Sequence, residues 1–186
     1  MHPILSPSDS MKRAVSRCNC GRVELEATGE PILCAACHCR SCRKGSAGIE
    51  QLKNAPRVLD ELGGTQYVLY RKDRVVCIKG AELLKDYRLA ATSPTRRVVA
   101  ECCNSAMFLE FGKGHWFSMY RARFGNDAPK ITMRIQRRDP DGAHRDEHGV
   151  PSYRSAPLRL VLKLISSRIA MFFNETGSGS LSPPRK

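Results

Sequence analysis

The sequence predicts a mainly β fold that is followed by one amphipathic helix near the C-terminus. Short segments in which polar and apolar residues alternate predict the strands, and a late segment with polar residues at helical spacing predicts the helix. Closely spaced cysteines in two clusters predict metal thiolates. The chain has 186 residues and is 41% hydrophobic. One domain of this size buries roughly two-thirds of the surface that its unfolded chain would expose.

Strands are expected where apolar residues recur with a period of two. In residues 22–27, Val23, Leu25 and Ala27 fall on one face, and a glycine and a proline then turn the chain. Further strands are expected at residues 67–70, 74–78, 97–100 and 107–111.

Two helices are expected, a short one at residues 80–87 and a longer one at Leu158–Phe173. In the longer segment, Arg159 and Lys163 recur at helical spacing among apolar residues. The segment spans only about sixteen residues and carries Lys163 and Arg168, so it is too short and too charged to cross a membrane. We expect it to pack on the core or on a second subunit, and the alternative is an interfacial helix on anionic lipid.

The domain organisation is expected to have four parts. Residues 1–13 form a flexible leader, 14–125 a zinc-binding domain, 126–176 a basic extension with the helix, and 177–186 a flexible tail rich in Gly, Ser and Pro. The N-terminal segment contains no apolar run typical of a signal peptide, so we expect a cytoplasmic protein. In that reducing compartment, nine cysteines persist as thiols or metal thiolates rather than as disulfides.

The cysteine spacing predicts zinc ligands. Cys18 and Cys20 lie in a C-x-C-G motif, and a bend that Gly21 permits would bring their sulfur atoms together. The stronger motif is C-x-C-x-x-C, formed by Cys37, Cys39 and Cys42, after which Gly45 and Ser46 indicate a loop. Three protein ligands leave a fourth zinc position open, which is typical of catalytic sites.

His38 is flanked by two of these cysteines, and this adjacency disfavours its binding to the same metal ion. Two interpretations of His38 stay open: a functional role such as proton transfer, or a polar side chain that supports the metal ligands or lies on the surface.

The net charge of +13 suggests nucleic acid or an anionic membrane surface as a partner. Acidic residues between 139 and 147 interrupt the basic run, which favours a solvated face of mixed sign over a nucleic-acid site. The late basic residues are Arg134, Arg137, Arg138, Arg145, Arg154, Arg159, Lys163, Arg168, Arg185 and Lys186.

The pattern C-x-C-G-x-V at residues 18–23, G-x-P at 29–31 and C-H-C-x-x-C-R-K at 37–44 resembles the glutathione-dependent formaldehyde-activating enzyme family, which also includes centromere protein V. The resemblance covers residues 14–125 and is most specific in the N-terminal half. It implies a zinc-binding β-tent fold with two zinc sites. The structural site would use Cys18 and Cys20 with a later cysteine pair, and the site associated with catalysis would use the Cys37 motif.

The later pair departs from the family pattern F-C-x-x-C-G. Cys103 stands at its second cysteine, but Ala100 stands at its first. Cys102 is the nearest substitute, although neighbouring side chains on a strand point to opposite faces, so using both requires a bulge or turn. The alternatives are Cys34, a water molecule or an incomplete site. Cys77 is expected to be a small buried hydrophobic residue.

The resemblance implies a zinc-dependent carbon–sulfur lyase that joins formaldehyde to the thiol of glutathione, giving S-hydroxymethylglutathione. Zinc could bind the thiol as a thiolate or polarise the aldehyde oxygen, and the sequence does not choose. Arg40 and Arg43 are expected to anchor the glutathione carboxylates, with solvent-exposed loop charges as the alternative.

A shared fold and shared metal ligands do not fix the substrate, so functions other than this enzyme stay open. The second hypothesis is a zinc-stabilised module that binds nucleic acid or a protein through its basic surface. A thiol redox protein is disfavoured, because Cys39 and Cys42 are not expected between the strand and helix of a thioredoxin-like unit. The sequence leaves oligomerisation open.

Overall fold

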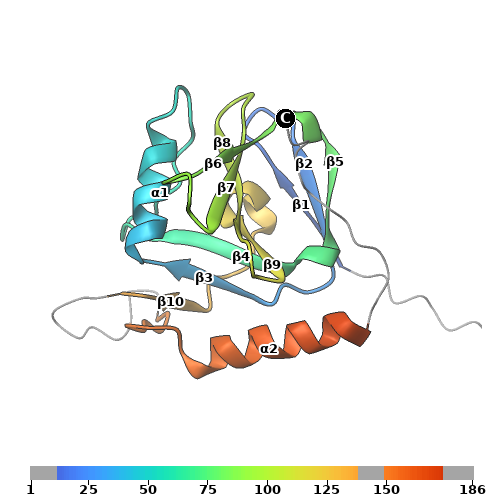
Figure 1. Ribbon diagram of the computed structural model, residues 1–186, viewed down its shortest axis with the longest axis vertical. Coiled ribbons are helices and arrows are strands. Elements are labelled where there is room, and N and C mark those ends of the chain that lie inside the picture. Colours follow the sequence, from blue (N-terminus) through green and yellow to red (C-terminus); the bar gives the residue numbers. More distant parts are fainter. Residues whose placement is uncertain (1–11, 138–148, 174–186) are drawn as a thin grey trace, which may run out of the picture.

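A computed structural model describes residues 12–137 and 149–173 of the chain. Two β-sheets make up most of the described structure, with a helix along one edge and a C-terminal helix beneath (Figure 1). The mainly β class with a C-terminal helix is therefore confirmed. Residues 1–11 of the predicted leader (residues 1–13) and the whole predicted tail (residues 177–186) lie outside the described residues, whereas Arg13 begins the first strand.

The smaller sheet has three antiparallel strands in the order β1-β2-β5, and the larger sheet has seven in the order β10-β3-β4-β9-β8-β7-β6. All neighbours in the larger sheet are antiparallel except β10 and β3, which are parallel. The strands are β1 (Arg13–Arg17), β2 (Glu24–Thr28), β3 (Leu33–Cys37), β4 (Thr65–Arg71), β5 (Val75–Lys79), β6 (Leu84–Tyr87), β7 (Thr95–Ala100), β8 (Ser105–Phe111), β9 (Trp116–Tyr120) and β10 (Met133–Ile135). Short 3-10 helices lie at η1 (Lys72–Arg74), η2 (Ala81–Leu83) and η3 (Arg121–Asp127).

The main core lies between the two sheets. Leu25 and Ala27 of β2 are fully buried, as the alternating pattern predicts, and they belong to the same cluster as Val68, Phe108 and Met119 of the larger sheet. The strands predicted around residues 67–70, 74–78, 97–100 and 107–111 are all present as β4, β5, β7 and β8.

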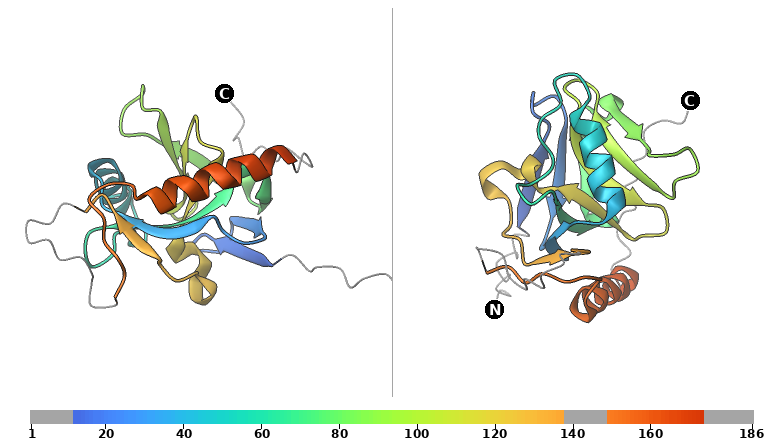
Figure 2. Two further views of the ribbon diagram at one scale, coloured as in Figure 1. Left: turned by 90° about the horizontal axis from the view of Figure 1, so that it is seen from below. Right: turned by 90° about the vertical axis from the view of Figure 1, so that its left-hand side faces the viewer.

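A second apolar cluster lies where the two helices pack on the larger sheet. Helix α1 (Arg40–Glu50) contributes Ile49, and helix α2 (Leu158–Phe173) contributes Leu160. Helix α2 lies along the outside of the molecule below β3 and β10 (Figures 1 and 2). Among the described residues, no helix is long and apolar enough to span a membrane.

Two local predictions were wrong. Residues 80–87 form η2 and then strand β6 rather than a helix, because Leu84 is buried and β6 pairs with β7. The loop expected at Gly45 and Ser46 is the middle of α1. Both residues face the interior, where Ser46 Oγ lies 2.8 Å from Thr65 Oγ1, so tertiary packing outweighs their low helix propensity.

Candidate metal centres

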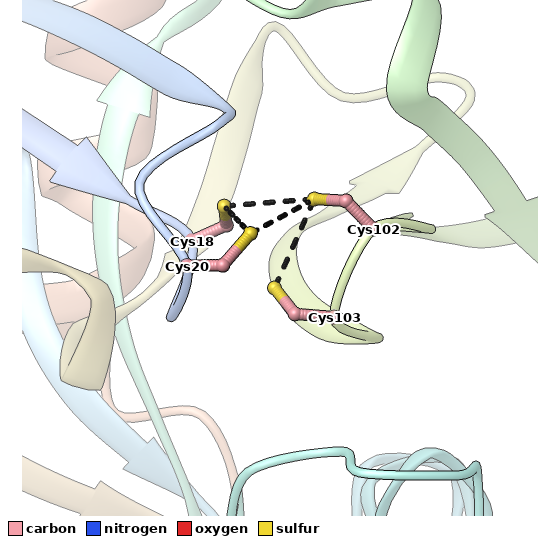
Figure 3. A group of neighbouring side chains, drawn as sticks. All are labelled: Cys18, Cys20, Cys102 and Cys103. Atoms are coloured by element: carbon pink, nitrogen blue, oxygen red, sulfur yellow. Dashed lines mark hydrogen bonds between the residues drawn. The ribbon is translucent and has the colours of Figure 1, made fainter.

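The first candidate centre is a four-cysteine cluster whose sulfur atoms point toward one another (Figure 3). The sulfur–sulfur distances are 3.6 Å for Cys18–Cys20, 3.8 Å for Cys18–Cys102, 3.4 Å for Cys20–Cys102 and 3.9 Å for Cys102–Cys103. Tetrahedral zinc with Zn–S bonds of about 2.3 Å requires sulfur atoms about 3.8 Å apart. The donor set therefore fits one zinc ion with a closed thiolate shell.

The turn between β1 and β2 presents Cys18 and Cys20. Gly21 has a φ of +73°, and its backbone N–H donates to the Cys18 carbonyl oxygen at 3.0 Å. The Val23 N–H donates to Cys18 Sγ at 3.2 Å, which helps to hold that sulfur in place. The expected bend at Gly21 is confirmed, because only a left-handed residue closes this turn.

The turn between β7 and β8 presents Cys102 and Cys103. The Cys103 N–H donates to the Ala100 carbonyl oxygen at 3.2 Å, and Asn104 has a φ of +50°. This tight turn brings the side chains of Cys102 and Cys103 to one side, as is required if both are ligands of the same metal ion. Cys34 lies elsewhere, with its Sγ 3.5 Å from the Pro129 carbonyl oxygen, and is not a member of the cluster.

Cationic side chains surround the four-cysteine cluster. Arg22 Nη2 donates to the Cys102 carbonyl oxygen at 3.2 Å, and Arg123 Nη1 donates to Ser105 Oγ at 3.2 Å. The backbone N–H and then the guanidinium of Arg22, followed by Cys102, lower the pKa of Cys20 to about 6. Such positive surroundings offset the excess negative charge that four thiolates retain around a divalent ion.

The second candidate centre contains Cys37, Cys39 and Cys42, whose sulfur atoms all lie within 4.8 Å of one another. Cys37 is the last residue of β3, Cys39 caps the N-terminus of α1, and Cys42 lies in its first turn. The three sulfur atoms come from one short strand-to-helix connection, and no fourth Cys, His or carboxylate of the described residues joins the group. The donor set fits zinc with one position left for another ligand.

The helix N-terminus favours a thiolate at Cys39. Its Sγ accepts a hydrogen bond from the Cys42 N–H at 3.4 Å. Hydrogen bonds from the thiols of Cys37 and then Cys42 lower the pKa of Cys39, and backbone N–H groups lower it further.

A cavity of about 670 Å³ lies beside this second cluster. Cys39 lines it, and positions 40, 43 and 44 of α1 share the helix face that borders it. The described lining contains several cations and no carboxylate. The lining residues are His38, Cys39, Arg40, Arg43, Lys44, Leu62, Gln136 and Arg137.

The sequence-predicted residues near this cavity therefore come together. Arg40 and Arg43 are exposed on α1 rather than on a loop, and His38 is buried with its ring against Gly64. Leu62 and Arg137 also line an adjacent, larger cavity of about 1000 Å³.

Arg97 is a site residue that sequence reasoning missed. Its side chain is 0% exposed, and Nη2 donates to the Ser41 carbonyl oxygen at 2.7 Å and to Ser41 Oγ at 3.2 Å. Its Nε and Nη1 have no hydrogen-bond partner among the described residues. This buried guanidinium therefore holds the first turn of α1 at Ser41, which lies between Cys39 and Cys42 in the sequence. The sequence feature that could have revealed it is the presence of an arginine in the strand predicted at residues 97–100, where a buried charge is unusual.

Several other predictions need correction or qualification. Cys77 is partly buried rather than fully buried, and its thiol donates to the Lys79 carbonyl oxygen at 3.3 Å. Cys39 and Cys42 lie at the start of α1, just after β3, but β4 runs antiparallel to β3, so no thioredoxin-like parallel unit forms, as expected.

The late basic residues do not form one surface in the described part of the chain. Arg134 is buried and its Nη1 lies 2.8 Å from Asp60 Oδ2, whereas the cations of α2 are exposed. Arg138, Arg145, Arg185 and Lys186 lie outside the described residues.

One cysteine motif lies before β2 and the other after β3, and this part of the chain is similar to a known protein family. Residues 13–58 match the glutathione-dependent formaldehyde-activating enzyme family. The match contains β1, β2, β3, α1 and the cysteines from Cys18 to Cys42, and it confirms the resemblance predicted from the motifs. This family is named for activating formaldehyde with glutathione.

No curated protein matches the chain. A crystal structure of a Rhodobacter sphaeroides protein from structural genomics has 17% sequence identity and a TM-score of 0.45, and the alignment covers 63% of this chain and 96% of that one.

Proposed function

We propose that the protein is a zinc-dependent carbon–sulfur lyase-type enzyme that acts on the adduct of formaldehyde, or a related small carbonyl compound, with glutathione or a similar thiol. The observation that carries the proposal is that Cys39 belongs to both the metal centre and the cavity wall. Its sulfur belongs to the three-sulfur cluster, and the same residue lines the cationic cavity. A small anionic thiol in that cavity would therefore lie beside the metal centre.

Cys37, Cys39 and Cys42 would hold the catalytic zinc, and Cys18, Cys20, Cys102 and Cys103 the structural one. Zinc at the three-cysteine centre would supply a Lewis acid able to stabilise a substrate thiolate or an aldehyde oxygen. The structural centre would tie the β1–β2 turn to the β7–β8 turn and so position the larger sheet.

The chain's own residues would bind and orient the thiol substrate. Arg40 and Arg43 present guanidinium groups along the cavity, and each can hold one carboxylate through paired hydrogen bonds. Glutathione carries two carboxylates, so two anchors would fix its cysteine portion relative to Cys39. A cavity of about 670 Å³ falls within the range of small-molecule sites.

The reaction is a balanced addition without oxidation or reduction. The thiol sulfur forms a bond to the carbonyl carbon, the carbonyl π-bond breaks, and the proton that the thiol loses ends on the former carbonyl oxygen. In the lyase direction the same carbon–sulfur bond breaks and the proton returns to sulfur. His38 lines the cavity and is the candidate for carrying this proton.

Exchange spectroscopy by NMR at equilibrium tests the proposal, because formaldehyde and glutathione also combine without a catalyst. The zinc-loaded chain is expected to accelerate exchange between glutathione and its adduct, and Cys39→Ser is expected to return the rate to the spontaneous value. Cys77→Ser is the matched control, because that cysteine lies outside both clusters. A zinc-loaded chain that leaves the exchange rate unchanged would overturn the proposal.

A further inference from the structure

Helix α2 carries a face of large apolar side chains that no described part of the chain covers. These side chains are between 39% and 83% exposed. They account for most of the exposed large hydrophobic residues in the described structure. The set is Leu158, Val161, Leu162, Ile165, Ile169, Phe172 and Phe173.

The exposed residues share one side of the helix. Successive residues of an α-helix are rotated by about 100°, so this set falls within an arc of about 120°. The opposite side faces the protein, where Leu160 is buried and Leu164 packs on the same cluster. Ser167 Oγ also lies 2.7 Å from His115 Nε2. Helix α2 is therefore anchored through one side and presents the other to its surroundings, as its place outside the sheet indicates (Figure 2).

The flanks of the apolar arc are cationic. By the same rotation, Arg159 lies near one edge of the arc and Arg168 near the other, and both are exposed. Lys163 lies closer to the protein side, where its Nζ donates to the Ile32 carbonyl oxygen at 3.4 Å. The sequence from Gly149 to Phe173 contains no acidic residue. Arg168 also lies over the Phe172 ring, with its guanidinium carbon 5.2 Å from the ring centroid.

We propose that this face of α2 binds the surface of an anionic lipid bilayer, with the helix lying in the plane of the interface. Charge complementarity selects this occupant. The apolar arc would enter the boundary between headgroups and acyl chains, while the flanking cations would meet lipid phosphates. Pairing of two α2 helices through the same face would instead bring cations together without any acidic partner.

Sedimentation of the full chain with vesicles tests the proposal. The comparison is between vesicles of phosphatidylcholine with about 30% phosphatidylglycerol, which have a strongly anionic surface, and vesicles of pure phosphatidylcholine. The wild-type chain is expected to sediment with the anionic vesicles at low salt and to be released as salt rises. Absence of binding to anionic vesicles at low salt would overturn the proposal.

Paired variants separate the α2 face from the general effect of the positive net charge. Ile165→Ser with Ile169→Ser is expected to lower the vesicle partition coefficient by at least about tenfold, because two apolar side chains leave the interface. Ile78→Ser is the matched control, because Ile78 on β5 is 50% exposed, close to the 51% and 52% of Ile165 and Ile169. The control is expected to bind like the wild type.

Two results would overturn the assignment even if vesicles bind. Unchanged binding by the Ile165→Ser, Ile169→Ser variant would mean that net charge alone drives association. Analytical ultracentrifugation that shows a dimer in the wild type and a monomer in this variant would assign the face to a second copy of the chain. The lipid assignment predicts the same sedimentation coefficient for both in the absence of vesicles.

Discussion

Arg97 on β7 holds the first turn of α1 through Ser41, whose carbonyl oxygen lies 2.7 Å from Arg97 Nη2. The contact crosses from the interior of the larger sheet to the helix that carries Cys39 and Cys42. Gly45 makes it possible, because a Cβ at this position would lie 2.1 Å from Arg97 Nε. The position of the cysteine cluster therefore depends on a buried arginine and on a glycine beside it.

Gly45→Ala is expected to destabilise the protein. Alanine has the higher helix propensity, but its methyl group would displace a fully buried guanidinium, so the free energy of unfolding should fall by about 2 kcal/mol. Urea denaturation measures the change. Gly112→Ala is the control, because its Cβ would meet only the Pro94 carbonyl oxygen at 3.5 Å. Equal stability of the two variants would contradict the packing argument.

The zinc content should be close to two ions per chain, measured by elemental analysis on metal-replete protein. Cys18→Ser is expected to lower it to one ion, because one of four ligands at the structural centre is lost. Cys34→Ser should keep two, since its sulfur lies outside both clusters. A drop with Cys34→Ser but not with Cys18→Ser would contradict the ligand set assigned to the structural centre.

Protonation of Asp60 at acidic pH should lower the stability of the loop around Asp60 and Gly64. Its Oδ1 accepts from the Gly64 N–H at 2.7 Å, and its Oδ2 from Arg134 Nη1 at 2.8 Å. Burial raises the pKa of Asp60, but the hydrogen bonds from Arg134 and then Gly64 outweigh it, so the net pKa is lowered. The stabilisation is therefore present above the unfolded-state pKa of about 3.9 and is lost as the pH falls through the lower folded-state value.

Asp60→Asn should remove that pH dependence and lower the free energy of unfolding at pH 7 by about 3 kcal/mol, because Arg134 would lose its charged partner in a buried position. Denaturation at several pH values measures both effects. The exposed Asp127→Asn serves as the control, with an expected change within about 0.5 kcal/mol. An Asp60→Asn variant that loses stability on acidification as steeply as the wild type would rule out this role for Asp60.

The strands and the cysteine motifs could be predicted because their signals are local. The alternation of Leu25 and Ala27 fixes which face of β2 enters the core, and the spacing of Cys37, Cys39 and Cys42 brings their sulfur atoms together within one connection. The need for a turn at Cys102 and Cys103 also follows from the alternation of side chains along a strand.

Other features depend on contacts between distant segments. Strand β10 pairs with β3 across roughly one hundred residues of chain, as in the register of Met133 with Ala35, and no local pattern encodes that partner. Helix α1 contains Gly45 and Ser46, which locally favour a loop, and only the packing against Arg97 and Thr65 explains its stability. The role of Arg97 is hidden for the same reason.

The most direct test of the account is a glutathione titration of the cobalt-substituted chain followed by visible absorption. The account predicts that glutathione changes the cobalt ligand-field bands in the wild type and in Cys18→Ser, but not in Cys39→Ser. Unchanged bands in the wild type at millimolar glutathione would contradict the claim that the metal of the Cys37, Cys39 and Cys42 centre is open to an outside thiol.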